Sequence, residues 1–266
     1  MRSRRSVDPT APEKLPYSDY VDAVAANASG LAAVLRGGPA TSPVPSCPAW
    51  SLAELGAHAG DFASFYAHRI CDATGAPRPP WPDTWRHGGA SPLIGVAAAT
   101  YFDDRAQFLV ALLRATSPDA AVRTWKEDDQ TAHFVARRSA HELAVHRVDA
   151  QLATGEAAPI DAELAADGIE EIFMMLDVFK KRDARRVGGT AASLALHPTD
   201  GPRRWVVVLD GDAASVERRP GPADLSLTGT TSDLELLLYG RPVAEDVRRD
   251  GDHEALEAWY RVFSFT

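Results

Sequence analysis

Apolar residues recur at helical spacing over the first part of the chain. Residues 17–35 carry alanine, valine and leucine at short, helix-like intervals, and the glycines and prolines of "RGGPATSP" follow them. This pattern predicts a helix that ends near residue 35. A second apolar stripe follows Ser51 and Glu54, which have the spacing of a helix-capping box. The same periodicity predicts further helices over residues 93–114, 132–153 and 161–181.

Residues 74–92, which read "TGAPRPPWPDTWRHGGASP", separate the second and third predicted helices. Their prolines and glycines oppose regular structure, and a loop of this length in a compact domain is often functional. We therefore expect Trp81 and Trp85 in this loop to line the mouth of a binding site.

After Arg186 the pattern changes to short runs of strand-forming residues separated by Gly, Pro and Asp. "TTSDLELLLYG" then predicts a helix with Ser232 and Glu235 as a second capping box, and "DHEALEAWYRVF" predicts a last helix. The strand candidates are "TAASLALH", "RRWVVVLD", "ASVERRP" and "ADLSLTG". The fold class predicted is an α-helical bundle followed by a smaller α+β domain. The expected boundaries are a disordered tail over 1–14, the bundle over 15–182 and the α+β domain over 183–266.

The composition of the chain argues against nucleic acid and membrane as binding partners. The chain has 266 residues, 45% of them hydrophobic, and a formal net charge of −9, which argues against a nucleic-acid partner. No stretch approaches the roughly 20 apolar residues needed to cross a bilayer, so no membrane segment is expected. "MRSRR" at the start is not followed by an apolar run, and Cys47 and Cys71 form no C-x-x-C pair. A cytoplasmic, reducing location is expected, with a packing role for Cys47.

The stretch "HELAVHRVDA", residues 141–150, differs by one residue from a metalloprotease signature. In that signature two histidines four residues apart bind zinc on one helical face. His141 and His146 are five residues apart, so on a helix they point roughly 140° away from each other. Glu142 and His146 are four residues apart and share a face. A metal on this helix would therefore use Glu142 as a ligand.

His58 supplies a candidate third ligand. It lies beside Leu55 and Phe62 on the apolar side of the second predicted helix. Two imidazoles and a carboxylate suit zinc with positions left for water or substrate. The spacing alone leaves two other interpretations open, a hydrogen-bonded core histidine and a surface Glu142–His146 pair. The remaining histidines match no carboxylate pattern and are expected at the surface: His68, His87, His133, His197 and His253.

Stretches in order along the chain are similar to motifs of one known family. "VPSCPAWSLAELGAHAG" looks like that family's entry to its second helix, where a Cys-Pro-x-Trp turn leads to a metal-binding histidine, here His58. "RRSAHELAVHRVDAQLATG" is similar to its fourth-helix motif, with Glu142 and His146 in the ligand positions. "DLSLTGTTSDLELLLYGRP" resembles the end of its sterol-carrier-like C-terminal domain. The sequence thus resembles the mycothiol-dependent maleylpyruvate isomerase group of the DinB-like superfamily.

The resemblance implies a DinB-like four-helix bundle and a divalent metal, usually zinc, held by His58, Glu142 and His146. It also implies mycothiol, the low-molecular-weight thiol of actinobacteria, as cosubstrate. One stretch departs from the family pattern. Tyr239 and Pro242 flank Gly-Arg in "LLYGRP", where the family often has a tryptophan and a second arginine, so the substrate end of the site is expected to differ.

Further residues are assigned roles around this metal. Asp149, one turn beyond His146, is expected to hold the site from behind, and Arg147 to neutralise charge on the bound cofactor. Arg241 is expected to meet a carboxylate of the substrate or the thiol.

Two functions of different class follow from these assignments. The first is an enzyme that adds the thiol to a small electrophile, by S-transfer or by isomerisation of a double bond. The second is a non-catalytic metal-containing module that binds a small ligand. A monomer or a homodimer is expected in either case.

Overall fold

The computed structural model divides the chain into two compact units, one comprising Pro16–Ile160 and the other built around Asp161–Phe265. The structure describes residues 14–81, 96–155, 157–182, 191–210, 213–242 and 247–263. Most of the predicted tail, as well as Trp85 and His87, lies outside these residues.

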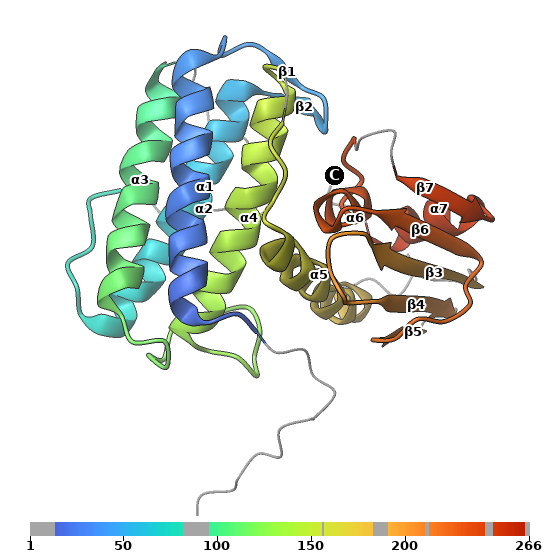
Figure 1. Cartoon of the computed structure of the whole chain (residues 1–266). Coiled ribbons are helices and arrows are strands. Elements are labelled where there is room, and N and C mark those ends of the chain that lie inside the picture. The colour runs from blue at the N-terminus through green and yellow to red at the C-terminus, as the bar shows by residue number, and fades with distance from the viewer. Residues whose placement is uncertain are drawn as a thin grey trace, which may run out of the picture. The chain divides into compact units, whose positions relative to one another are not determined.

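The first unit is a helical bundle (Figure 1). Helix α1 packs mainly against α4 and α3, and α2 packs against α3. Its helices are α1 (Tyr17–Gly37), α2 (Leu52–Thr74), α3 (Val96–Ala115) and α4 (Ala132–Leu152). They confirm the helices predicted for this part of the chain to within a few residues. A short hairpin of β1 (Pro43–Val44) and β2 (Cys47–Ser51) precedes α2 and was not predicted.

Helix α2 begins where the capping box places its start. The backbone N–H of Glu54 donates to Ser51 Oγ, and the Ser51 N–H donates to the Glu54 carboxylate at 2.7 Å. At the other end Gly75 takes the left-handed conformation, φ 75°, that favours glycine. In between, Gly60 lies under Tyr101 of α3, so close that an added Cβ would lie 2.5 Å from the tyrosine ring. Both ends and the packing distance of α2 are thereby fixed.

Helix α4 is buried on nearly all sides although many of its residues are polar. Thr131 caps it by accepting a hydrogen bond from the Phe134 N–H at 3.1 Å. Among its buried side chains, His141, His146 and Asp149 are each less than 8% exposed. Burying polar groups is unfavourable unless they are hydrogen-bonded or paired with an opposite charge. The side chains that pair with His146 and Asp149 belong to the site described below.

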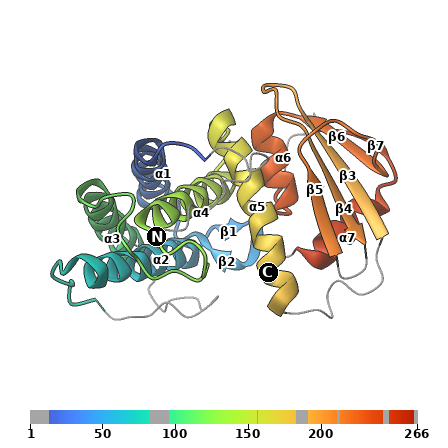
Figure 2. The same cartoon turned by 90° about the horizontal axis from the view of Figure 1, so that it is seen from below.

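The second unit combines a mixed sheet with helices α5 (Ala162–Arg182), α6 (Thr231–Leu238) and α7 (Glu254–Val262). The strand order is β5-β4-β3-β6-β7; β3 and β6 are parallel and the other neighbours antiparallel. The strands are β3 (Ala191–Pro198), β4 (Trp205–Asp210), β5 (Ala213–Glu217), β6 (Leu225–Gly229) and β7 (Arg248–Gly251). Within this unit the helices lie on one face of the sheet (Figure 2). The predicted α plus α+β fold class is confirmed.

Helix α5 is fixed to the sheet by a buried carboxylate. Glu170 accepts a hydrogen bond from Trp205 Nε1 at 2.8 Å and pairs with Arg218 at 2.7 Å. Helix α5 also packs against α6. The two units meet between Ile160 and Asp161, whereas the expected domain boundary followed residue 182. The difference arises because the packing partners of α5 belong to the second unit.

The capping box predicted for α6 is wrong. The helix is capped by Thr230, whose Oγ1 accepts from the Asp233 N–H at 3.1 Å, while Ser232 and Glu235 are buried side chains within the helix. Both pairs have suitable spacing, so local sequence could not choose between them. Strand β7 was missed because all its residues are exposed and it has no alternating apolar positions. Among the described helices, none is long and apolar enough to span a membrane.

Replacing Ser51 by alanine should lower the free energy of unfolding by about 1 kcal/mol, because one orphan donor at the start of α2 loses its acceptor. Hydrogen bonds from Ser51 lower the pKa of Glu54, so the box stabilises the fold above the ordinary carboxyl pKa, and this contribution is lost as pH falls through the lowered value. Urea denaturation measures both effects. Ser18→Ala, at an exposed position of α1, is the control, and an equal loss in that variant would contradict the capping explanation.

Candidate metal centre

Three side chains from two helices converge at one point of the bundle. His58 lies on α2, and Glu142 and His146 lie one turn apart on α4. The Nε2 atoms of His58 and His146 are each 3.3 Å from Glu142 Oε1, and one ligand atom from each residue lies within 4.8 Å of the others. The structure therefore brings together the three residues that were predicted as metal ligands.

This arrangement fits a small divalent cation. Zinc binds imidazole nitrogen and carboxylate oxygen at about 2.0–2.2 Å, which puts neighbouring ligand atoms of a tetrahedral site about 3.3–3.5 Å apart. Both nitrogen-to-oxygen separations here match that value. Two imidazoles and a carboxylate also form the set of three protein ligands that catalytic zinc sites use. The donor set and its spacing are those of a site that keeps a position for an exogenous ligand.

Glu142 is held as a carboxylate. Burial alone would raise its pKa, but Arg138, His146 and His58 outweigh this effect and hold the pKa well below its usual range. Arg138, one turn earlier on α4, makes a short ion pair with Glu142 Oε2 and leaves Oε1 directed at the two imidazoles. Arg138 was not singled out in the sequence, although its i, i+4 spacing to Glu142 is visible there.

Asp149 orients His146 from behind. It is completely buried, and its Oδ2 lies 2.9 Å from His146 Nδ1, while Ser46 Oγ donates to its Oδ1 at 2.5 Å. A proton on Nδ1 leaves Nε2 with the lone pair that a metal requires. Burial alone would lower the pKa of His146, but the hydrogen bonds to Asp149 and Glu142 outweigh burial and raise the pKa to about 9. The surroundings of His146 thus favour positive charge.

Trp50 forms one wall of the group and was missed as a site residue. Its ring centroid lies 4.6 Å from that of His58 and 6.3 Å from that of His146. It belongs to β2, the strand that leads into α2, so the hairpin carries it over the histidines. The sequence signal was its place in "CPAW", eight residues before His58. Cys47 of the same strand has its Sγ 3.9 Å from Asp149 Oδ2.

Two residues of α4 near the ligands face other parts of the bundle. The His141 ring lies edge-on to Tyr20 of α1, with centroids 6.1 Å apart, which agrees with its predicted rotation away from the Glu142–His146 pair. Arg147 Nε donates to Asn27 of α1 at 2.8 Å, and its terminal nitrogens donate to the carbonyls of Ala158 and Pro159. In this structure Arg147 joins the end of α4 to α1 and to the segment that follows.

Trp81 lies against a different part of α2. Its ring stacks on the Arg105 guanidinium at 4.6 Å, and its centroid is 5.3 Å from that of Phe108 and 6.4 Å from that of His68. His68 is ten residues beyond His58, about 15 Å along the helix. Trp81 and the ligand group are therefore not brought together. The expectation of a surface position for His68 is wrong, since its side chain packs in the bundle and is 4% exposed.

Arg241 belongs to the second unit, directly after α6. It is buried, its Nη1 donates to the Tyr239 carbonyl at 2.9 Å, and its guanidinium carbon lies 5.7 Å from the Tyr239 ring centroid. Gly240 between them takes φ 71°, a left-handed turn that ends the helix. The residue that departs from the family pattern, Tyr239, thus contacts the arginine assigned to the substrate.

Comparison with known proteins shows which domain family the bundle matches. The model of a domain family, described as the mycothiol maleylpyruvate isomerase N-terminal domain, matches residues 21–151, which include all three ligand residues. The bundle thus matches the N-terminal domain of that family. The family resemblance expected from the sequence is confirmed.

Two solved structures resemble most of the chain. One is a histidine-to-alanine mutant of the mycothiol-dependent maleylpyruvate isomerase, with a TM-score of 0.63 and 17% identity over 89% of this chain and 93% of that one. The other, the mycothiol-dependent maleylpyruvate isomerase itself, has a TM-score of 0.57 and 16% identity over the same shares. At this identity the likeness shows that the bundle and the second unit share the fold of those structures. No curated protein sequence matches the chain.

Purified protein should carry roughly one divalent ion per chain, and His146→Ala should lose it, because the two remaining ligands cannot hold zinc tightly. His141→Ala should retain it, since the His141 ring faces Tyr20. Elemental analysis of folded protein, checked by circular dichroism, gives the metal content. Equal metal in wild type and His146→Ala, or loss of metal in folded His141→Ala, would refute the ligand assignment.

Asp149→Asn should weaken zinc binding about ten- to hundred-fold while the fold is retained, because the amide fails to hold the imidazole as a carboxylate does. A competition titration with a chromogenic chelator measures this change. Ser46→Ala, which removes only a hydrogen bond to Asp149, should have a smaller effect. Unchanged affinity in Asp149→Asn would show that Asp149 serves packing alone.

Proposed function

We propose that this protein is a metal-dependent enzyme that uses a low-molecular-weight thiol, mycothiol, against a small electrophile. The observation that carries the proposal is the convergence of two imidazoles and a carboxylate from α2 and α4 at zinc-like spacing. The family of the bundle supports the thiol, and the three-residue ligand set supports a catalytic rather than a structural ion. The reaction is S-transfer to the electrophile or its thiol-assisted isomerisation.

His58, Glu142 and His146 would hold the ion, with zinc the best match to their donor atoms. When bound, such an ion supplies the positive charge that holds a thiol as its thiolate, the form that attacks electrophiles. Around it the protein keeps charges in place. Arg138 fixes the Glu142 carboxylate, and Asp149 keeps the proton of His146 on Nδ1.

The charged side chains around the three candidate ligands balance one another, so a bound divalent ion would give the site a net positive charge. Arg138 is ion-paired to Glu142 and lies beside it in the same buried turn of α4. The Trp50 ring covers His58 and removes water from one side of the group. With such an ion in place, a partly dry site of net positive charge would lower the free energy of a thiolate relative to the thiol. These residues would therefore support thiol activation.

Roles for the outer residues remain part of the proposal. Arg241 is proposed to bind a carboxylate of the substrate or the thiol through its planar guanidinium, and Arg147, Trp81 and Trp85 to contact the cofactor. Of these, Arg147 and Trp81 are engaged within the bundle, and Trp85 lies outside the described residues. Trp50 is a better supported wall for the thiol than either tryptophan of the loop.

The second candidate function is a metal-containing module that binds a small ligand without reaction. The hydrogen-bonded His146–Asp149 pair and the short Arg138–Glu142 pair would stabilise such a scaffold equally well. The two functions differ in the state of the bound thiol. The enzyme must exchange a thiol at the metal and release a product, whereas the module needs neither step.

Mycothiol should bind the metal-loaded protein more tightly than cysteine does, and binding should strengthen as pH rises toward the free thiol pKa, because the thiol loses a proton on binding. Isothermal titration calorimetry at several pH values measures both trends. His141→Ala is the matched control, since it keeps the ligands. The enzyme proposal fails if mycothiol binds no better than cysteine or binds equally to metal-stripped protein.

Turnover is tested separately. Incubation of metal-loaded protein with mycothiol and a cell extract, followed by mass spectrometry, should show conjugates or isomerised products that are missing with His146→Ala. Binding without either product would favour the module.

A further inference from the structure

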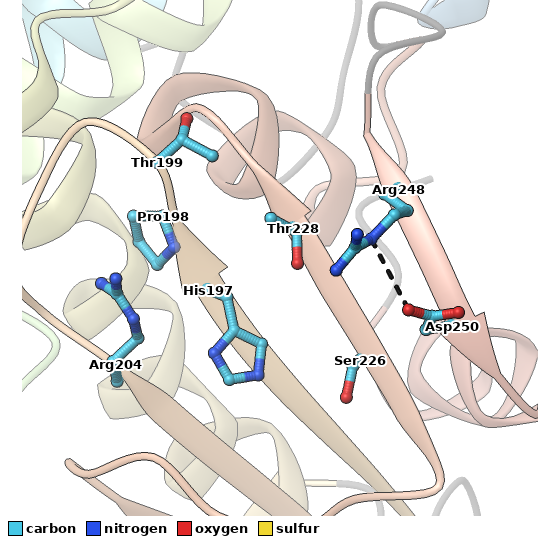
Figure 3. A pocket seen from close by; sticks show the side chains of 8 residues that line it. All are labelled: His197, Pro198, Thr199, Arg204, Ser226, Thr228, Arg248 and Asp250. Carbon is cyan, nitrogen blue, oxygen red and sulfur yellow. Dashed lines mark ion pairs between the residues drawn. The ribbon is translucent and has the colours of Figure 1, made fainter.

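The second unit carries a groove lined by basic and hydroxyl side chains, independent of the metal centre. It lies on the sheet face opposite the helices and has a volume of about 560 Å³ (Figure 3). Every residue that lines it belongs to β3, β6, β7 or the segments directly adjoining β3 and β4. Pockets of this size accept small organic ligands.

Strand register puts the basic side chains in one row. His197 pairs with Thr228, and Thr228 pairs with Arg248. Leu196 pairs with Trp205, so Arg204, one residue before, is level with His197. Since neighbouring strands are about 4.8 Å apart, the row from Arg204 to Arg248 spans about 14 Å at the backbone. Long side chains at its two ends can reach toward the centre.

Along β3 and β6, residues that face the groove alternate with apolar residues that face the helices. Leu196 and Leu227 point to the helices and are completely buried, whereas His197, Ser226 and Thr228 are partly exposed on the other side. A second row beside the first holds Ser226 paired with Asp250. Hydroxyl and carboxylate groups thus lie next to the basic row, as Figure 3 shows.

Electrostatics support convergence on His197. Burial, Arg204 and Arg248 together lower the pKa of this imidazole, which means that both guanidinium groups act on it. Arg204 Nη1 donates to the carbonyls of Gly201 and Arg203 at 2.8 and 2.6 Å, which holds the side chain at the end of the groove. Arg248 Nε lies 3.5 Å from Asp250 Oδ2. Two arginines against one carboxylate leave the groove positive on a chain whose formal net charge is −9.

We propose that this groove binds a small hydroxylated organic anion. Its phosphate or carboxylate group binds the row of Arg204, His197, Thr228 and Arg248, and its hydroxyls bind Ser226 and Asp250. Guanidinium and hydroxyl donors are the groups that proteins use for oxyanions, and a carboxylate beside them accepts from a sugar hydroxyl. The anion restores the balance of charge on the open sheet face.

The site is tested by calorimetric titration of the full-length protein with ribose 5-phosphate, gluconate and uncharged ribose. At least one anion should bind and ribose should not; which anion binds separates a phosphate site from a carboxylate site. Arg248→Gln should weaken binding about ten-fold or more, because a charge-assisted contact is lost. Arg249→Gln removes the same charge from the neighbouring position of β7, opposite Leu227, and should leave binding unchanged.

The position of the bound anion is tested with the imidazole signals in a proton–nitrogen NMR spectrum. The signal that disappears in His197→Gln should shift on addition of the anion. Binding should persist in His146→Ala, which separates this groove from the metal centre. Failure of both anions to bind at millimolar concentration, equal weakening by Arg249→Gln, or loss of binding in His146→Ala would overturn the proposal. None of these outcomes bears on the thiol chemistry.

Discussion

The burial of charge along α4 is the constraint on which the bundle and its site depend. Arg138, His146 and Asp149 lie in a helix that is surrounded by other elements, and an unpaired charge there would destabilise the fold by several kcal/mol. The chain resolves this by placing opposite charges one turn apart, Arg138 with Glu142 and His146 with Asp149. One oxygen of Glu142 and one nitrogen of His146 remain directed at His58. The arrangement that stabilises the helix is therefore the one that assembles the ligands.

Helical geometry explains why the candidate ligand group could be predicted from the sequence. The direction of a side chain on a helix follows from residue spacing, so the four-residue interval alone distinguishes Glu142 and His146 from His141. The same holds for the capping box at Ser51, where a local motif defines a local structure. Residue spacing was not enough to predict the place of His58, because its contact with α4 depends on how the two helices pack. Its apolar helix face made it a candidate, and the family resemblance assigned it to the metal.

Contacts made by strands and loops were harder to predict from the sequence. Trp50 approaches His58 only because the hairpin of β1 and β2 folds back onto α2, and two short strands leave no periodic signal. Trp81 sits in a proline-rich stretch whose composition indicates a loop but gives no direction, and the structure packs it on Arg105. The row of His197 and its neighbours requires the register of four strands, which no single segment encodes.

Two glycines of α2 bear on the spacing of the candidate ligands. His58 lies between Gly56, which abuts Leu35, and Gly60, which abuts Tyr101; an added Cβ at either would approach within 3 Å of these side chains. A methyl group at Gly56 would meet only the flexible end of Leu35, whereas one at Gly60 would meet the Tyr101 ring and the backbone of α3. A side chain at Gly60 would therefore push α2 from α3 and carry His58 away from Glu142. A wider triangle of donors suits larger cations with longer bonds, such as calcium, and fits zinc poorly. The absence of a side chain at Gly60 thus helps to set the spacing of the three candidate donors, through the clearance between two helices rather than through the donors themselves.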